Sequence, residues 1–213
     1  MTELTLKPSW KPRPYQIPLY AYLANGGKRA LGVWHRRAGK DMTVMNWTHE
    51  ALFDRVGTYW HMLPTLQQGR KVIWEGIYKD GTKKLDTFEP ATIKGIRNDD
   101  MKIEFHNGSI WQVTGSDNYD SLVGSNPVGV VFSEWSLTDP QAWEFIRPIL
   151  KENGGWAVFI YTPRGRNHGY DLMKVANRNP DWFSEVLTVD DTGMLSPEEI
   201  EKERLEGMSP DLI

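Results

Sequence analysis

A lysine follows a short glycine-containing turn directly after an apolar run near the start of the chain. The apolar run is Leu31–Trp34, the turn is His35–Gly39, and the lysine is Lys40. A helical pattern of apolar residues begins at Met42. Strand, turn and helix in this order place backbone N–H groups at a helix start, where the helix dipole favours anions. The segment therefore predicts a phosphate-binding loop, in which Lys40 contacts the β- and γ-phosphates of a nucleotide.

The loop departs at two positions from the common spacing G-x-x-x-x-G-K-[ST]. Trp34 stands at the first glycine position, and Asp41 stands where that spacing has the hydroxyl that holds Mg²⁺. Gly39 keeps the second glycine, which lets the backbone approach a phosphate closely. Two plainer interpretations stay open. Gly-Lys pairs also occur in ordinary surface turns, and Asp41 also suits the first turn of a helix as an acidic residue.

A second group of polar residues follows the apolar run Val128–Phe132. This run is continuous, as expected of a strand buried on both faces, and Ser133 and Glu134 follow it directly. In P-loop ATPases such a strand usually ends in Asp-Glu, where Asp holds Mg²⁺ and Glu activates the attacking water. Glu134 fits the second role, and Ser133 has a hydroxyl in place of the Asp. The alternative is that Glu134 caps or pairs at a strand end on the surface.

The two unusual residues, Asp41 and Ser133, suggest an exchange of metal ligands. The usual site pairs a hydroxyl on the loop with a carboxylate on the strand. Here the loop has the carboxylate and the strand has the hydroxyl. The charge around the metal is preserved by this exchange, so we predict that Asp41 and Ser133 hold the Mg²⁺ of Mg-ATP.

A third polar segment, Thr162–Gly169, follows the apolar run Trp156–Tyr161. At the end of that strand we expect Thr162 beside the γ-phosphate. Arg164 and Arg166 are suited to contacts with phosphates of ATP or DNA. The alternative is a surface loop rich in proline and glycine, with solvated arginines.

The elements that must position these residues alternate between strands and helices. Strands are predicted at 30–34, 58–63, 128–132, 156–161 and 185–189, and helices at 40–54, 65–77, 140–150 and 170–176. A β-hairpin is predicted at 101–114, around the turn His106–Gly108, and an extended, proline-rich arm at 1–14. The alternation predicts an α/β fold with a mostly parallel central sheet flanked by helices. In such sheets ligands bind at the carboxyl ends of the strands.

Composition narrows the class of protein. The chain has 213 residues and a formal net charge of −3, so no overall basic field indicates a nucleic acid partner. The absence of cysteine excludes disulfides and cysteine-bound metals. No apolar run approaches the length of a membrane span and no secretory signal is present, so we expect a soluble protein without membrane contact.

The segments, taken in order, resemble a known family. Arg36–Lys40, the strand that ends in Glu134, and Thr162–Gly165 follow one another, with Pro14–Gln16 upstream. Together they resemble the ATPase domain of the large terminase subunit of tailed bacteriophages, over roughly residues 10–190. The resemblance implies a P-loop NTPase of the RecA-like (ASCE) class, with the β-hairpin as an insertion. Its domain order implies an ATPase domain at 1–190 and, at 191–213, the start of a linker toward a C-terminal nuclease domain.

The resemblance also implies ATP and Mg²⁺ as cofactors and assigns roles to single residues. Gln16 matches the adenine-reading glutamine of the family, and Tyr15 is expected near the base. Glu134 matches the catalytic carboxylate, and Thr162 matches the residue that senses the γ-phosphate. The residues expected to bind the nucleotide are Tyr15, Gln16, His35, Arg36, Arg37, Ala38, Gly39, Lys40 and Asp41. The residues expected to act in catalysis are Glu134, Arg36, Arg37 and Thr162.

The implied function is ATP-driven packaging of double-stranded viral DNA into a procapsid in the host cytoplasm. The implied partners are the DNA, the portal protein, the small terminase subunit and further copies of the chain in a ring, usually a pentamer. Candidate DNA contacts are Lys83, Lys84, Lys102, Arg164 and Arg166. No nuclease activity is expected, because the nuclease carboxylates would lie beyond residue 213.

One family feature is missing from the expected place. Val123 stands where many relatives have an arginine that reaches into the site of a neighbouring subunit. Such an arginine would have to come from elsewhere in the chain, or the arginines of the loop would have to suffice. The candidates are Arg97, Arg147, Arg164 and Arg166.

Two other functions stay open. A helicase-like P-loop ATPase would share the phosphate chemistry but would unwind duplexes, and it normally carries a second RecA-like domain. A chain of 213 residues leaves little room for that domain. A non-catalytic nucleotide-binding or assembly module would explain Asp41 and Ser133 as marks of a decayed site. Glu134 argues against this module, because a decayed site has no need of a water-activating carboxylate.

Overall fold

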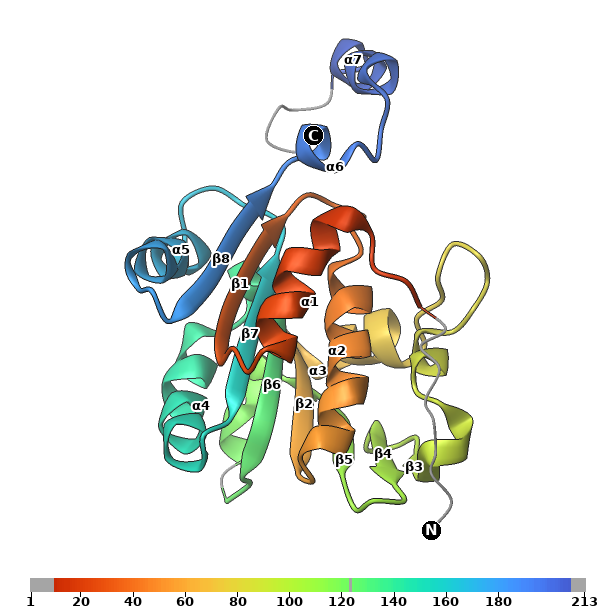
Figure 1. The fold of residues 1–213 in the computed structure, drawn as a ribbon, viewed down its shortest axis with the longest axis vertical. Helices are drawn as coiled ribbons and strands as arrows, with labels where there is room; N and C mark the ends of the chain where they lie inside the picture. Colours follow the sequence, from red (N-terminus) through yellow and green to blue (C-terminus); the bar gives the residue numbers. More distant parts are fainter. Residues whose placement is uncertain (1–9, 123, 208–213) are drawn as a thin grey trace.

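Most strands of the sheet run parallel. The computed structural model describes residues 10–122 and 124–207. Its strands are β1 (Arg29–Trp34), β2 (Thr58–Leu63), β3 (Ile93–Arg97), β4 (Lys102–Phe105), β5 (Ile110–Gly115), β6 (Pro127–Ser133), β7 (Trp156–Tyr161) and β8 (Trp182–Leu187). They form one sheet in the order β3-β4-β5-β2-β6-β7-β1-β8 (Figure 1). The pairs from β5 through to β8 are parallel, and β4 pairs antiparallel with both β3 and β5.

Helices cover both faces of this sheet (Figure 1). The α-helices are α1 (Ile17–Ala24), α2 (Lys40–Asp54), α3 (Leu66–Gly69), α4 (Pro140–Asn153), α5 (His168–Arg178), α6 (Val189–Thr192) and α7 (Pro197–Leu205). One core cluster joins α1 and α2 to one face, and a second joins α4 to the other. Helices α6 and α7 project beyond the edge at which β8 ends (Figure 1).

The central strands β6 and β7 hold the carboxyl edge of the sheet rigidly in place. Every residue of β6 and of β7 is buried, as expected of parallel strands covered on both faces. Phe132 and Phe159 stack on the same face of the neighbouring strands, with ring centroids 4.7 Å apart. The residues that follow these two strands are therefore held by a rigid core.

Several predicted elements are confirmed and others need correction. The helix at 40–54 and the strands at 58–63 and 156–161 are observed with those bounds. The predicted helix at 65–77 is a short α-helix, α3, followed by a π-helical turn at Arg70–Trp74. The predicted strand at 185–189 begins earlier, at Trp182, and ends at Leu187. The reason is that β8 lies at the sheet edge, where its half-exposed residues give a weak apolar pattern.

Helix α1, strand β3 and the short helix α6 were not predicted. Residues 1–9 of the predicted extended arm lie outside the described residues, and its last residue, Pro14, begins a 3₁₀ turn that leads into helix α1. Pro14 and Pro18 each open a helical turn, a position to which proline is well suited. Strand β3 extends the predicted hairpin into three antiparallel strands.

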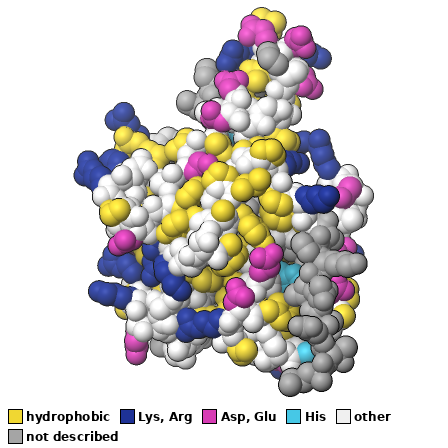
Figure 2. All heavy atoms as spheres, viewed as in Figure 1, with side chains coloured by type: hydrophobic (Ala, Val, Ile, Leu, Met, Phe, Trp, Pro, Cys, Tyr) yellow, Lys and Arg dark blue, Asp and Glu magenta, His cyan; other side chains and the backbone are white. Residues whose placement is uncertain are grey.

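Helix α1 has no charged residue and Ile17 is 49% exposed. Figure 2 shows apolar side chains gathered on the side of the molecule on which α1 lies. Within residues 10–122 and 124–207, no helix has the length and apolar character that crossing a membrane requires.

Candidate nucleotide site

Three polar segments predicted from the sequence meet at the carboxyl edge of the sheet. They are the loop His35–Gly39 after β1, the pair Ser133 and Glu134 at the end of β6, and the segment that begins with Thr162 after β7. Strands β6, β7 and β1 are adjacent and parallel, so their carboxyl ends lie side by side. This is the edge at which open parallel sheets bind ligands.

Lys40 lies inside the loop, at the first position of α2. Its ammonium donates to the backbone oxygens of Trp34 and His35, at 3.1 Å each, and to Thr162 Oγ1 at 2.9 Å. These three bonds use all three N–H groups of a lysine. Lys40 is 8% exposed, and burial lowers its pKa, although the charges of Glu134 and Asp41 oppose this. The predicted neighbourhood of Lys40 and Thr162 is thus observed directly.

Two residues of the loop have positive φ angles. Gly39 has φ 80° and ψ 28°, a left-handed conformation that glycine adopts without steric cost. A Cβ added to Gly39 would lie 2.7 Å from Gln16 Nε2, so a side chain there would displace Gln16. Arg37 also has a positive φ of 65°. The loop turns sharply and leads directly into α2.

Asp41 and Ser133 are in direct contact. Ser133 Oγ donates to Asp41 Oδ1 at 2.7 Å, and His61 Nε2 lies 3.3 Å from the same oxygen. Lys84 Nζ lies 3.8 Å from Asp41 Oδ2. Burial would raise the pKa of Asp41, but the hydrogen bond from His61 and the charge of Lys84 outweigh it and hold that pKa well below its usual range. Asp41 is therefore a charged carboxylate with a fixed orientation.

This pair of oxygens fits a Mg²⁺ ligand set. Adjacent oxygens of an octahedral Mg²⁺ site lie about 2.9 Å apart, given Mg–O distances of about 2.0–2.1 Å. The 2.7 Å between Ser133 Oγ and Asp41 Oδ1 is close to that spacing. Among the described residues, no group of three or more His, Asp or Glu side chains is placed to hold a metal. A metal here would need phosphate oxygens and water as further ligands, as is usual for Mg²⁺ at nucleotide sites.

Glu134 occupies a strained position at the end of β6. Its φ of 55° and ψ of 44° lie in the left-handed region, which costs a non-glycine residue about 1–2 kcal/mol. Burial raises the pKa of Glu134, and the charge of Lys40 opposes that rise. A half-buried carboxylate with a raised pKa beside a phosphate loop suits the acceptance of a proton from water.

Gln16 and Tyr15 lie against the outer side of the loop. Gln16 is 1% exposed, and its Nε2 donates to the oxygen of Ala38 at 2.9 Å while its Oε1 accepts from the backbone N–H of Arg13 at 2.9 Å. Tyr15 donates to the same Ala38 oxygen at 3.1 Å. Both residues therefore hold the loop backbone, and their contact with an adenine base stays a prediction.

The other predicted loop residues differ in their surroundings. His35 Nε2 lies 2.8 Å from Thr192 Oγ1, so its ring contacts α6 and not the lysine. Burial lowers the pKa of His35. The side chains of Arg36 and Arg37 are exposed. The guanidinium of Arg36 is close enough for its charge to act on both Lys40 and Glu134: it adds to the lowering of the Lys40 pKa by burial and opposes the rise of the Glu134 pKa by burial.

Two residues of the site were not predicted as such from the sequence. His61 is fully buried in the middle of β2, and the only signal was a polar residue inside an apolar strand. Lys84 was a candidate DNA contact, but its side chain is only 14% exposed and pairs with Asp41. Both come from segments whose position relative to the loop is set by the fold.

The remaining basic candidates lie away from this edge or on its surface. Arg97 pairs with Glu104 at 2.8 Å, and Arg147 pairs with Glu144 at 3.0 Å. Arg164 and Arg166 are exposed on the segment that follows β7. Further candidate positions are Lys83, which is exposed, and Lys102, which lies 3.9 Å from Glu104. Val123 lies outside the described residues.

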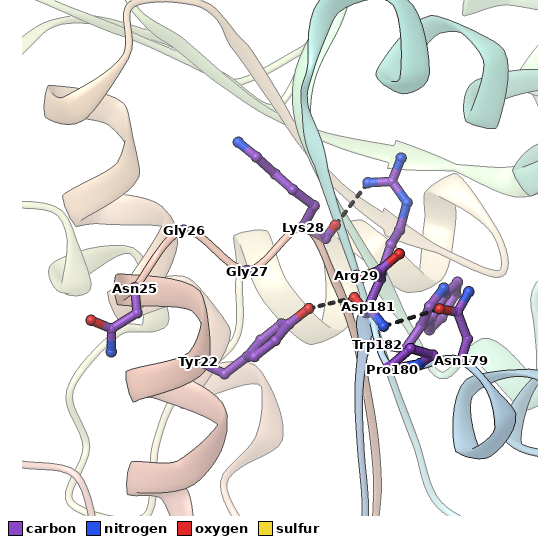
Figure 3. A pocket seen from close by; sticks show the side chains of 10 residues that line it. All are labelled: Tyr22, Asn25, Gly26, Gly27, Lys28, Arg29, Asn179, Pro180, Asp181 and Trp182. Carbon is purple, nitrogen blue, oxygen red and sulfur yellow. Dashed lines mark hydrogen bonds between the residues drawn. The ribbon is translucent and has the colours of Figure 1, made fainter.

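An open surface hollow of about 680 Å³ lies at the opposite edge of the sheet. Figure 3 shows it between the loop that follows α1 and the loop that precedes β8, where Tyr22 donates to the backbone oxygen of Asp181 at 2.8 Å. Lys28 and Arg29 also line it. None of the predicted site residues does, and the amino ends of parallel strands are not where such sheets bind ligands.

The known proteins whose sequences are similar to this chain are terminase large subunits of phages. No family model matches the chain. It is 30% identical to the terminase large subunit of Escherichia phage T5 over 115 residues, 49% of this chain and 25% of that protein. It is 25% identical to the terminase large subunit of Thermus virus P23-45 over 180 residues, 77% of this chain and 36% of that protein. The chain thus spans about a quarter to about a third of the length of these relatives.

Comparison with solved structures decides the fold. The large terminase ATPase domain of Thermus phage P74-26 matches with a TM-score of 0.74 and 22% identity, over 98% of this chain and 96% of that chain. The chain has the fold of a large terminase ATPase domain. The large terminase of a thermophilic bacteriophage, in complex with ATP-gamma-S, has a TM-score of 0.70 and 13% identity, over 94% of this chain and 50% of that one. The predicted α/β class and the predicted resemblance to large terminase subunits are confirmed.

The role of Gln16 in holding the terminase-like loop leads to a prediction about stability. We expect Gln16→Ala to lower the free energy of unfolding by about 1–3 kcal/mol, because it leaves the part-buried Arg13 N–H and the buried Ala38 oxygen with fewer partners. Urea unfolding measures the change. Gln67→Ala removes the same group from an exposed position of α3 and is expected to change stability by no more than about 0.5 kcal/mol. Equal losses in both variants would contradict the assigned role.

Proposed function

We propose that this chain is the ATPase domain of a motor that couples ATP hydrolysis to the movement of double-stranded viral DNA into a procapsid. The observation that carries the proposal is the convergence of Lys40, Thr162, Asp41, Ser133 and Glu134 at one sheet edge of a terminase ATPase fold. The similarity to terminase large subunits supports the packaging role.

The arrangement suggests how each residue acts on ATP. Lys40 binds the β- and γ-phosphates, and Asp41 and Ser133 would hold Mg²⁺. The metal, when bound, neutralises charge on the phosphates. Glu134 accepts the proton of the attacking water. Lys40 donates a hydrogen bond to Thr162, so a phosphate that binds the Lys40 ammonium also changes the hydrogen bonding of Thr162.

The remaining nucleotide contacts come from residues around the loop. Arg36 and Arg37 are exposed beside it and suit a grip on phosphate oxygens. Gln16 and Tyr15 lie next to Ala38, and we assign them to the adenine side of the nucleotide. The ADP and ATP-gamma-S complexes of the large terminase from the thermophilic bacteriophage support nucleotide binding by a domain of this fold.

The partners follow from the packaging role. They are double-stranded DNA, the portal protein, the small terminase subunit and further copies of the chain in a ring, which act together at the procapsid in the host cytoplasm. Arg164 and Arg166 are the candidate DNA contacts that are exposed next to the site. Removal of either charge should weaken DNA binding regardless of sequence and reduce its salt dependence.

Single-turnover hydrolysis of Mg-ATP, with protein in excess over nucleotide, tests the proposal. We expect ATP cleavage in the presence of Mg²⁺ and none after chelation of the metal. Binding without cleavage would favour the non-catalytic module. A strand-displacement assay on a forked duplex separates a helicase from a packaging motor, which is expected to leave the strands paired.

The raised pKa of Glu134 predicts a pH dependence of this reaction. A general base acts in its deprotonated form, so hydrolysis should decline as the pH falls through the pKa of Glu134. Because burial raises that pKa above 4.5, the decline should begin at a higher pH than for an ordinary glutamate. Single-turnover rates between about pH 5 and pH 8 measure it, with nucleotide binding at each pH as the control. A rate that stays flat to pH 5 would contradict the assignment.

A further inference from the structure

The backbone turn that carries Glu134 is held by contacts from another part of the chain. A 3₁₀ turn, Trp135–Leu137, follows Glu134, and Leu137 N–H donates to the Glu134 oxygen at 2.8 Å. Glu134 itself is left-handed, with φ 55°. A non-glycine residue persists in such a conformation only where its surroundings over-determine it. The contacts around this turn therefore decide where the carboxylate of Glu134 points.

The first residues of α5 supply two of these contacts. His168 Nε2 donates to the oxygen of Trp135 at 2.6 Å, and since a carbonyl only accepts, the proton is on Nε2. Asn167 Nδ2 donates to the oxygen of Ser136 at 3.2 Å, while its Oδ1 caps α5 by accepting from Gly169 N–H at 2.9 Å. The start of α5 is thus bonded to the two residues that follow Glu134.

The turn has little freedom to relax on its other side. Trp135 is 2% exposed, and its ring packs against Phe132 at 5.4 Å and Phe159 at 4.9 Å. The ring of His168 meets that of Trp135 edge-on, with centroids 5.0 Å apart. Ser136 Oγ donates to the backbone oxygen of Thr162 at 3.3 Å. The turn is therefore fixed between the central strands and the start of α5.

We propose that His168 is a positioning residue for ATP hydrolysis, acting through its bond to the Trp135 oxygen to hold the turn that aims Glu134. This inference rests on the proposed ATPase function. His168 bonds the backbone of the turn and acts through Glu134, so it affects the hydrolytic step and not the binding of nucleotide. Loss of the Nε2 donor leaves the Trp135 oxygen with the Thr138 N–H at 3.1 Å as its remaining partner, so the turn is held less firmly and the strained φ of Glu134 can relax toward ordinary values.

Two substitutions of His168 distinguish the effect of its N–H donor from the effect of its aromatic ring. His168→Phe keeps a ring against Trp135 but removes the N–H, and we expect the single-turnover rate at saturating Mg-ATP to fall at least about ten-fold. His168→Gln keeps an N–H donor of similar reach but removes the ring, and we expect it to retain at least about half of the parent rate. Binding of Mg-ATP-gamma-S should stay within about two-fold of the parent in both variants.

A matched control and a double variant show whether the effect passes through Glu134. His49 is a half-buried histidine of α2 whose Nε2 accepts from Glu89 N–H at 3.4 Å, and His49→Ala is expected to leave the rate within about two-fold. In a Glu134→Gln background, His168→Phe should cause no further loss, because the group that it positions is already gone. Thermal unfolding checks that each variant is folded, and His168→Ala replaces the phenylalanine variant if that one is not.

The outcomes are distinct from those of the proposed function. A parent chain that does not cleave ATP overturns the proposed function, and the role of His168 falls with it. A parent that cleaves ATP, with a His168→Phe variant of equal rate, overturns only the inference. The inference is also overturned if nucleotide binding falls as far as the rate, if His168→Gln is as slow as His168→Phe, or if the losses from His168→Phe and Glu134→Gln multiply.

Discussion

Replacing Glu134 with glutamine is expected to lower the single-turnover rate of ATP hydrolysis by at least about 100-fold, while Mg-ATP binding stays within about three-fold of the parent. Glutamine has nearly the shape of glutamate but its amide cannot take up the proton of the attacking water. The carboxylate of Glu134 lies near Lys40, and burial raises its pKa, so proton acceptance is the property that the substitution removes. Rapid-quench hydrolysis and equilibrium binding of ATP-gamma-S measure the two quantities.

Glu144→Gln is the matched control for this substitution. Glu144 lies on α4, is 64% exposed and pairs with Arg147 at 3.0 Å, so the same chemical change should leave both rate and binding unaltered. A Glu134→Gln protein that hydrolyses ATP at a rate near the parent's would show that another group activates water. A large loss of binding would show that Glu134 serves the site through its structure instead.

The arrangement of the site could be predicted where it follows from parallel strands. Lys40 follows β1 and Thr162 follows β7, and because these strands are adjacent and parallel their carboxyl ends must meet. The observed bond of 2.9 Å between the two side chains confirms that they are neighbours. The contact between Asp41 and Ser133 follows from the same rule, since α2 begins at the edge where β6 ends.

The rest of the site depends on packing that a local pattern does not show. Lys84 reaches Asp41 because the segment between α3 and β3 folds back over the start of α2. His61 is buried on β2 like the apolar residues on either side of it. Only its contact with Asp41, which the sequence does not show, marks it as a residue of the site. His168 lies two residues before the predicted start of its helix, and its bond to the Trp135 oxygen depends on where α5 packs against the sheet. The missed helix α1 shows a different limit, because prolines fit both a helical first turn and an extended arm.

The exchange of ligands between loop and strand leads to the second large prediction. We expect Asp41→Ser to weaken the Mg²⁺-dependent binding of ATP-gamma-S by at least about ten-fold, because it removes the charged oxygen ligand of the proposed metal site. Ser133→Asp should also weaken it, since it places a second carboxylate beside Asp41, where Ser133 Oγ now donates at 2.7 Å. Titration of ATP-gamma-S with and without Mg²⁺ gives the metal-dependent part of the affinity.

The double variant Asp41→Ser with Ser133→Asp decides whether the two positions have exchanged roles. It returns the hydroxyl to the loop and the carboxylate to the strand, and we expect it to bind Mg-ATP-gamma-S within about three-fold of the parent. Such a recovery would show that the two substitutions are energetically coupled. Two substitutions with independent effects would instead give the sum of the single losses. Asp54→Ser removes an exposed carboxylate from the far end of the same helix and should change nothing. If the double variant instead shows the sum of the two single losses, Asp41 does not share a metal with Ser133, and its charge serves only to fix His61 and Lys84 at the start of α2.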